Sequence, residues 1–344
     1  MIRLFANANY DFIKWRRLAF SITGLIMLVG AIDLVARGLN YSIEFTGGTL
    51  VQIEVAHKVP TADIRAALDK VGLRGADIYN FGSDTSYVVR ARLGAESAQG
   101  EAGTQAVADS VARAFDQSVG QGQYRIERRE AVGPKVGREL QGKALLAILF
   151  SFVVTLIYLA VRFEWRFGLA AVVATAHDVV ATIAFIGMLR LEVSLTVVAA
   201  VLSMVGYSLN DTIIIFDRVR ENLRKFRRQN LYEILNLSIN ETLPRSVLTH
   251  GTTIATTLSL LLLAGEVIRP FAWVMSFGIF TGTFSSIYIA APVLLWIEKR
   301  WPGEDARGAR TFGTRAPATP PVATRPGPQS SSPPAPPRAP QPAR

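Results

Sequence analysis

Six long apolar stretches constrain the fold of this 344-residue chain more than any other feature of its sequence. A helix that crosses the hydrocarbon core of a bilayer needs about 20 consecutive apolar residues, and each stretch approaches or exceeds that length. Soluble proteins carry about 25% charged residues, whereas charged residues make up only 19% of this chain. The sequence therefore predicts a multi-pass α-helical membrane protein with six transmembrane helices, at residues 18–36, 144–161, 168–189, 193–216, 247–265 and 271–297.

The first apolar stretch follows basic residues, as the hydrophobic part of a secretory signal peptide does. A signal peptide ends in a small-residue cleavage site, but residues 33–37 include Asp33 and Arg37 and fit such a site poorly. We therefore interpret residues 18–36 as an uncleaved anchor that follows a short cytoplasmic segment, residues 1–17.

Lysine and arginine are distributed unevenly between the two sides of the predicted helices. The segments 1–17, 162–167 and 218–246 hold 13 of these cations, whereas the two short loops on the opposite side hold only Arg190 and Arg269. Positively charged loops stay on the cytoplasmic side, so both termini are predicted to be cytoplasmic. The net charge of +10 then reflects topology and attraction to anionic membrane lipid, and it does not indicate nucleic-acid binding.

Residues 37–143 lie between the first two predicted spans and have the charge balance of an ordinary soluble domain, with 14 basic and 13 acidic residues. Alternating apolar residues predict strands, and Thr61 is expected to cap the first of two helices. The β-α-β-β-α-β order fits an external, periplasmic α+β domain of the ferredoxin-like type, although other folds have a similar content. The strands are expected at residues 49–55, 77–81, 86–92 and 124–130, and the helices at 61–71 and 102–119.

Two segments have the composition of flexible chain. Residues 132–137 contain Gly133 and Pro134 and are predicted to form a hinge into the five-helix transmembrane bundle of residues 144–300. The tail, residues 301–344, has eleven prolines beyond Pro302 and cannot bury enough apolar surface to offset the entropy of folding. We therefore expect a disordered, proline-rich cytoplasmic tail, which we favour over a proline-motif ligand.

Several kinds of chemistry are excluded by what the sequence lacks. The chain has no cysteine and only three histidines, His57, His177 and His250, which excludes thiol catalysis, iron–sulfur clusters and cysteine zinc sites. Residues 137–144 resemble a phosphate-binding loop, but Ala144 replaces the Ser or Thr that would hold magnesium. We therefore expect no metal site, no cofactor and no enzymatic activity.

Polar side chains inside the predicted spans are the strongest functional signal. A charge at mid-membrane costs roughly 2.5–3.5 kcal/mol, so such a residue has by default a function. His177 and Asp178 lie in the third span, and Asn210, Asp211 and Asp217 lie in the fourth. We favour interhelical hydrogen bonding for the threonines of the fifth span, whereas the carboxyls of Asp178 and Asp211 can also exchange a proton.

Asp211 and Arg245 are expected to form a pair between the fourth and fifth spans. Asp211 lies roughly 9 Å along its helix from Asp217, which marks the inner end of the fourth span. Arg245 opens the fifth span on the same side. Antiparallel helices joined by a cytoplasmic loop would bring the two charges face to face.

Small residues recur every four positions in the sixth span, at Gly278, Gly282, Ser286 and Ala290. Such a ridge lets another helix approach closely. The sequence leaves open whether that helix belongs to this chain or to another.

Several motifs together closely resemble the SecF family of the bacterial Sec protein-export machinery. The match is longest and most specific in residues 205–222, and it covers about residues 1–300. The other matching motifs lie at residues 41–49, with Gly47, Gly48 and Thr49; at 132–137, with Gly133 and Pro134; and at 176–179 and 243–253.

The resemblance implies a partner and a task. A subunit of this kind pairs with SecD in a twelve-span assembly of the resistance-nodulation-division type, in the bacterial cytoplasmic (inner) membrane. The assembly would associate with the SecYEG channel, with YajC and YidC as accessory proteins and with SecA indirectly. It would use the proton-motive force to draw unfolded preproteins outward. Asp211 and Arg245 would serve proton passage. From their places in the predicted spans we expect the other polar residues of the pathway to be Asp178, Asp217, Asn210 and His177.

A non-energised scaffold that docks translocase partners is the alternative hypothesis. Under it, neutralising Asp211 would matter only through stability. A small-molecule exporter fits less well because such exporters normally have twelve spans in one chain.

Reporter fusions test the predicted topology. A reporter fused after Gly100 should behave as external, and reporters fused after Arg228 and Ala316 should behave as cytoplasmic, because cations stay on the cytoplasmic side. An external signal at Arg228 would contradict the six-span arrangement.

Overall fold

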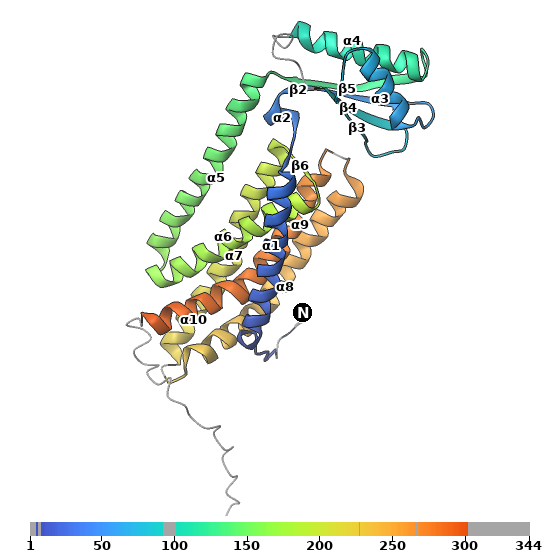
Figure 1. The fold of residues 1–344 in the computed structure, drawn as a ribbon. Coiled ribbons are helices and arrows are strands. Elements are labelled where there is room, and N and C mark those ends of the chain that lie inside the picture. The colour runs from blue at the N-terminus through green and yellow to red at the C-terminus, as the bar shows by residue number, and fades with distance from the viewer. Residues whose placement is uncertain (1–4, 6–7, 92–100, 227, 266, 302–344) are drawn as a thin grey trace, which may run out of the picture. The chain divides into compact units, whose positions relative to one another are not determined.

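The computed structural model describes residues 5, 8–91, 101–226, 228–265 and 267–301. Figure 1 shows a group of long helices and a small α+β domain that is inserted after the first of them. The predicted disordered tail lies outside the described residues from residue 302 onward.

Six helical segments in the described part of the chain are long and apolar enough to cross a membrane. The predicted fold class, a six-helix membrane protein with one external α+β domain, is confirmed. A short 3-10 turn, η1 (Ile13–Trp15), precedes the first span. The spans are α1 (Arg16–Arg37), α5 (Pro134–Arg162), α6 (Trp165–Met188), α7 (Leu195–Lys225), α8 (Leu231–Leu263) and a last segment made of α9 (Arg269–Ser285), the π-helical turn η2 (Ser286–Ala290) and α10 (Ala291–Arg300).

The helices extend beyond the apolar stretches from which they were predicted. Helix α7 continues to Lys225 instead of ending at residue 216, and α8 begins at Leu231 instead of residue 247. These polar turns pack against each other, and Arg218 Nε of α7 donates to Glu241 Oε2 of α8 at 2.6 Å. Hydropathy marks only the lipid-compatible part of a helix, so it cannot report polar extensions of this kind.

Pro244 lies inside α8, although the next residue, Arg245, was expected to open the fifth span. Proline has no N–H group to donate to the carbonyl four residues earlier, which usually ends or kinks a helix. The early half of α8 has its own contacts. Asn240 forms two hydrogen bonds with the backbone of Tyr10, at 2.9 and 2.8 Å, and Asn236 Oδ1 accepts from the amide of Ile13 at 3.1 Å. The N-terminal segment is thereby attached to α8.

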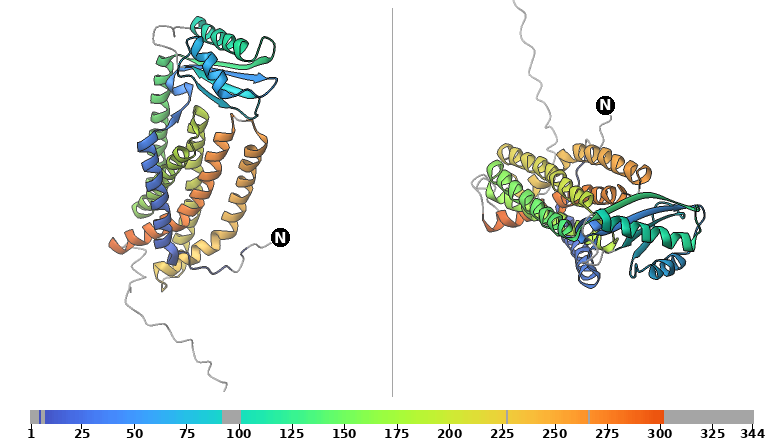
Figure 2. Two further views of the ribbon diagram at one scale, coloured as in Figure 1. Left: turned by 45° about the vertical axis from the view of Figure 1, so that its right-hand side comes forward. Right: turned by 90° about the horizontal axis from the view of Figure 1, so that it is seen from above.

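The centre of the helix bundle is formed by α6, α7 and the α9–α10 segment. At least half of the apolar stretch of each of these spans is buried inside the protein, whereas only 6–17% of the apolar stretch is buried in α1, α5 and α8. Figure 2 shows these helices side by side in two further views. The exposed faces of α1, α5 and α8 are therefore the ones left for lipid or for a partner.

The ridge of small residues on α9 packs against α7 of the same chain. A methyl group on Gly278 would lie 2.1 Å from Met204 Cγ, and one on Gly282 would lie 2.9 Å from Ser208 Cβ. Real contacts of these lengths do not occur, so only glycine permits this approach. The question that the sequence left open is answered, because the ridge serves packing within the chain.

The external domain has the ferredoxin-like arrangement that the sequence predicted. Its four antiparallel strands are ordered β3-β4-β2-β5. Helices α3 and α4 share one core with the sheet, in which Ile53, Leu68 and Phe115 are fully buried. The expected Thr61 cap is wrong, because Pro60 occupies the N-cap position and no side chain caps the helix. The elements are β2 (Gly48–Val55), α3 (Thr61–Lys70), β3 (Asp77–Asn80), β4 (Ser86–Ala91), α4 (Glu101–Ser118) and β5 (Tyr124–Val132).

A short two-stranded sheet joins the start of this domain to the loop between α6 and α7. The strand β1 (Asn40–Tyr41) pairs in parallel with β6 (Glu192–Val193). A single helical turn, α2 (Ile43–Thr46), then leads into β2. The chain therefore enters the external domain while it is attached to the membrane-spanning part.

The α7–α9 contact predicts the effect of one methyl group. Gly282→Ala should lower the stability of the detergent-solubilised protein by about 1–3 kcal/mol, because overpacking a tight core forces the neighbours apart. Gly206→Ala is the matched control, since a methyl group there meets nothing within 4 Å. Equal thermal unfolding temperatures for the two variants would contradict the close approach.

Candidate functional site

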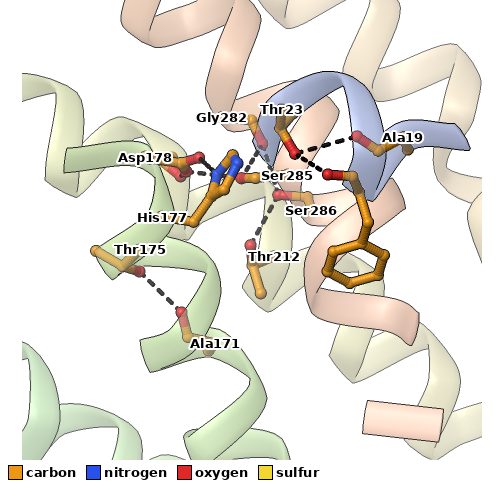
Figure 3. A network of polar contacts seen from close by, with 12 residues as sticks. Ala19, Thr23, Ala171, Thr175, His177, Asp178, Thr212, Gly282, Ser285 and Ser286 are labelled. Atoms are coloured by element: carbon orange, nitrogen blue, oxygen red, sulfur yellow. Dashed lines mark hydrogen bonds and ion pairs between the residues drawn. The ribbon is translucent and has the colours of Figure 1, made fainter. Parts of the chain in front are cut away.

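Asp178 of α6 is the centre of a buried hydrogen-bond network, which Figure 3 shows from close by. Its side chain has no exposed surface. Oδ2 accepts hydrogen bonds from Ser208 Oγ of α7 at 2.5 Å and from Ser285 Oγ of α9 at 2.6 Å, while Oδ1 lies 3.0 Å from His177 Nδ1. Three helices therefore converge on one carboxyl group in the middle of the bundle.

His177 lies between this carboxyl group and helix α1 (Figure 3). Its ring borders an apolar cavity of about 100 Å³ that is also lined by Ile26 of α1 and Phe280 of α9. Its Nε2 atom has no hydrogen-bond partner among the described residues. This environment suits an imidazole that donates its Nδ1–H to Asp178 and keeps Nε2 as an acceptor.

Asp211 lies on α7, about one turn after Ser208, and it contacts α8 instead of α6. Its Oδ1 accepts a hydrogen bond from Ser246 Oγ at 2.5 Å, and its Oδ2 has no partner in the described part of the chain. His250 follows one turn later on α8, and its ring packs edge-on against Tyr207 with the centroids 5.3 Å apart. Helix α7 thus contacts one buried carboxyl group, Asp178, through Ser208 and carries the other, Asp211, one turn later.

The predicted ion pair between Asp211 and Arg245 is not formed. Ser246 takes the place beside Asp211, and Arg245 is exposed. Neighbouring residues of a helix point about 100° apart, so a helix that turns Ser246 toward Asp211 leaves Arg245 beside that contact, where its charge still acts on Asp211 without an ion pair. The two helices are neighbours as expected, but the contact was placed one residue off.

The remaining polar residues of the predicted pathway lie outside the buried clusters. Asp217 forms an ion pair with Arg162 of α5 at 2.7 Å, and it lies inside α7 instead of marking its end. Asn210 is exposed. It belongs to an exposed set on α7 and α8, here named the polar face, which consists of Ser203, Gly206, Asn210, Arg245, Thr249, Thr252 and Thr256.

The glycine motif at residues 47–49 allows the backbone to make a tight turn against α5. Gly47 and Gly48 have φ angles of 74° and 137°, which L side chains rarely adopt. A methyl group on Gly137 of α5 would lie 2.8 Å from the carbonyl oxygen of Phe45 and 3.0 Å from the amide nitrogen of Gly47. Thr49 is fully buried at the start of β2. Two motifs far apart in the sequence therefore meet here.

The predicted hinge at residues 132–137 is shorter than expected. Gly133 is the N-cap of α5, and α5 begins at Pro134. The first turn of α5 is packed against α2, so extended chain is limited to the junction of β5 with α5. Glycine and proline are typical of a flexible segment, but proline is also common in the first turn of a helix.

One polar contact that sequence reasoning missed holds the external domain to the α6–α7 loop. Arg90 of β4, which is only 7% exposed, forms an ion pair with Glu192 of β6 and donates from Nη1 to the carbonyl of Tyr41 at 3.1 Å. Burial raises the pKa of Glu192 and, with help from the Glu192 charge, raises the pKa of Tyr79 to about 12. The Tyr79 hydroxyl therefore stays protonated and donates to Glu192 at 3.4 Å.

The α2–α5 contact yields a matched pair of variants. Gly137→Ala should speed amide hydrogen exchange in residues 45–49, because the added methyl group displaces the backbone of that turn. Gly142→Ala, in the same helix, meets nothing within 4 Å and should leave exchange unchanged. Unaltered exchange in Gly137→Ala would show that the turn does not depend on this approach.

Comparison with protein families gives two matches. The family described as "Protein export membrane protein SecD/SecF, C-terminal" matches residues 111–300, and the "SecD/SecF GG Motif" matches residues 34–59. The first match spans the buried carboxyl groups, and the second includes Gly47 and Gly48.

Individual proteins agree with these families. The chain is 53% identical over 322 residues to the protein translocase subunit SecF of Gemmatimonas aurantiaca, covering 93% of this chain and 96% of that protein. It is 38% identical over 286 residues to the protein translocase subunit SecF of Escherichia coli O157:H7, covering 83% and 87%.

Two solved structures share this fold. The crystal structure of SecDF, a translocon-associated membrane protein from Thermus thermophilus, matches with a TM-score of 0.76 and 34% identity. A structure of SecDF in a super-membrane-facing form matches with a TM-score of 0.62 at the same identity. Each match covers 86% of this chain, but the chain spans only 39% and 40% of the length of those two proteins.

Proposed function

This chain belongs to the SecD/SecF family of protein-export membrane proteins, and from that premise we propose that it is the SecF-type half of a proton-driven translocase. Its partner would be SecD, and the pair would assist preproteins that leave through the SecYEG channel. The pair would lie in the cytoplasmic membrane, with both termini of this chain in the cytoplasm, in a transport role without catalysis. YajC, YidC and, indirectly, SecA would be further partners.

The observation that carries this proposal is the pair of buried carboxyl groups beside α7. A charge inside the bilayer costs roughly 2.5–3.5 kcal/mol, so carboxyl groups at such depth are rarely kept for packing alone. Asp178 and Asp211 contact serine hydroxyls, and a hydroxyl can donate to a carboxylate or accept from a carboxylic acid. Both protonation states can therefore be hydrogen-bonded without rebuilding the site.

The polar face supports the presence of a partner subunit. An arginine and several threonines in membrane-spanning helices would meet lipid if nothing covered them, and polar groups in spans normally face other helices. Arg245 and Asn210 lie on this face, and Asp211 is buried directly behind it. A SecD subunit on the polar face would enclose these groups and complete the proton pathway, of which this chain supplies one side.

Proton binding can supply enough free energy to shift the helices. One charge that crosses a potential of 100 mV gains about 2.3 kcal/mol, which shifts a two-state equilibrium nearly fiftyfold. The two solved SecDF structures each cover 86% of this chain but fit it unequally, with TM-scores of 0.76 and 0.62, which supports a fold that can change shape. We propose that movement passes from α7 to the external domain through the junction at Gly133.

The proposal predicts how three variants behave in export driven by an imposed proton gradient. Asp211→Asn should insert and bind SecD normally but lose the gradient-dependent stimulation, because an amide cannot exchange the proton. Arg245→Met should do likewise, because the Arg245 charge acts on Asp211 through space although the two form no ion pair. The double variant should be no worse than either single one if this electrostatic link is what each variant removes.

Ser246→Ala is the matched control for Asp211→Asn. It removes the 2.5 Å hydrogen bond to Asp211 but keeps the carboxyl group, so it should retain most of the stimulation. If the protein were a scaffold without energy coupling, the two variants would affect export only as far as they lower the stability of the protein. Full stimulation in Asp211→Asn would favour that scaffold.

A further inference from the structure

A cavity of about 790 Å³ lies where the outer end of α1 meets the α6–α7 loop and the edge of the external sheet. Four arginines line it: Arg37 at the end of α1, Arg65 of α3, Arg90 of β4 and Arg190 of the α6–α7 loop. Of the described carboxylates, two line it with them, Asp77 and Glu192. The cavity is therefore cationic, and none of the roles considered above uses it.

Two of the four guanidinium groups have no carboxylate partner among the residues that the structure describes. Arg90 is paired with Glu192, and Arg37 lies 3.4 Å from Asp33. No ion pair joins Arg65 or Arg190 to a carboxylate in the part of the chain that the structure describes. Arg190 is held in place, because its Nη1 donates to the carbonyl of Gly38 at 2.7 Å. Its remaining N–H donors stay available to an anion.

The position of the cavity indicates where such an anion comes from. Helix α1 has 22 residues, roughly 33 Å at 1.5 Å per residue, so its last residue, Arg37, lies at the level of the lipid headgroups. Exposed apolar side chains are close in sequence to two of the arginines, because Val35, which is 90% exposed, lies two residues before Arg37 and the exposed Leu189 directly precedes Arg190. Lipid chains can lie against these residues while the headgroup enters the cavity.

Arg190 is notable because it lies in a short loop on the side where such loops carry few cations. The short loops between spans on the external side contain only Arg190 and Arg269, as expected for the side that positive charge avoids. Gathering Arg65 and Arg190 around one cavity with Arg37 and Arg90 brings like charges together, and neither Arg65 nor Arg190 has a carboxylate counter-ion among the described residues. A phosphate group, which arginine recognises through paired N–H donors, supplies that counter-ion.

We propose that this cavity binds a phosphate group presented by an anionic phospholipid of the leaflet on the external-domain side. The phosphate lies between Arg65 of the external domain and Arg190 of the membrane-spanning part. Bound lipid therefore adds a second bridge between the two parts, beside the Arg90–Glu192 pair.

Binding to the purified full chain in detergent tests the site. Native mass spectrometry would follow titration with dihexanoyl phosphatidylglycerol, dihexanoyl phosphatidylcholine and inorganic phosphate. Phosphatidylglycerol should bind in a saturable 1:1 manner and more tightly than the other two. Arg65→Gln should weaken it about tenfold, the loss expected for one hydrogen-bonded charge. Arg74→Gln, an exposed arginine of the same domain that does not line the cavity, should have no effect.

Three outcomes would overturn the proposal. Equal affinities of the Arg65→Gln and Arg74→Gln variants would place the lipid elsewhere, and equal binding of phosphatidylcholine would show that apolar contacts dominate. Inorganic phosphate that binds as tightly as phosphatidylglycerol would identify a site for the free ion. Arg190→Asn, which tolerates the positive φ of 53° at this position, repeats the test from the membrane side and should weaken binding to a similar extent.

Discussion

The close packing of α9 on α7 is the contact on which the rest of the membrane-spanning part depends. Gly278 and Gly282 let the backbones approach, and Ser208 and Ser285 thereby reach the same oxygen of Asp178. A larger residue at either glycine would separate the helices and leave a buried carboxyl group with fewer donors. Leaving a buried carboxylate without its hydrogen-bond donors costs more free energy than the net contribution of the same hydrogen bonds to stability, because the group stays desolvated.

Helix α7 connects this packed centre with the opposite side of the bundle. It contacts Asp178 through Ser208 and carries Asp211 one turn later, where Ser246 of α8 is the donor. Among the described residues, the first carboxyl group has three hydrogen-bonding partners and the second has one. That asymmetry fits a fixed site at Asp178 and an adjustable site at Asp211, next to the polar face on which we propose that SecD docks.

The sequence predicted the spans and the external fold because both follow from simple periodicity. Membrane helices need long apolar runs, which are visible in the sequence. The order of predicted strands and helices was enough to predict the ferredoxin-like sheet. Helix ends were misplaced where polar turns pack on each other, as Arg218 and Glu241 do. Ser285 was missed because 107 residues separate it from Asp178. Arg245 was paired wrongly because helical phase relative to a neighbour is a tertiary property that one sequence does not reveal.

The central claim is that Asp211 exchanges a proton within the membrane. Infrared difference spectroscopy of the complex with SecD, as the pH on one side is changed, follows the carbonyl stretch of a protonated carboxyl group. We expect a pH-dependent band that disappears in Asp211→Asn and persists in Asp217→Asn, whose carboxylate is ion-paired with Arg162. A band that is unchanged in Asp211→Asn would contradict the claim and assign the exchange to another group.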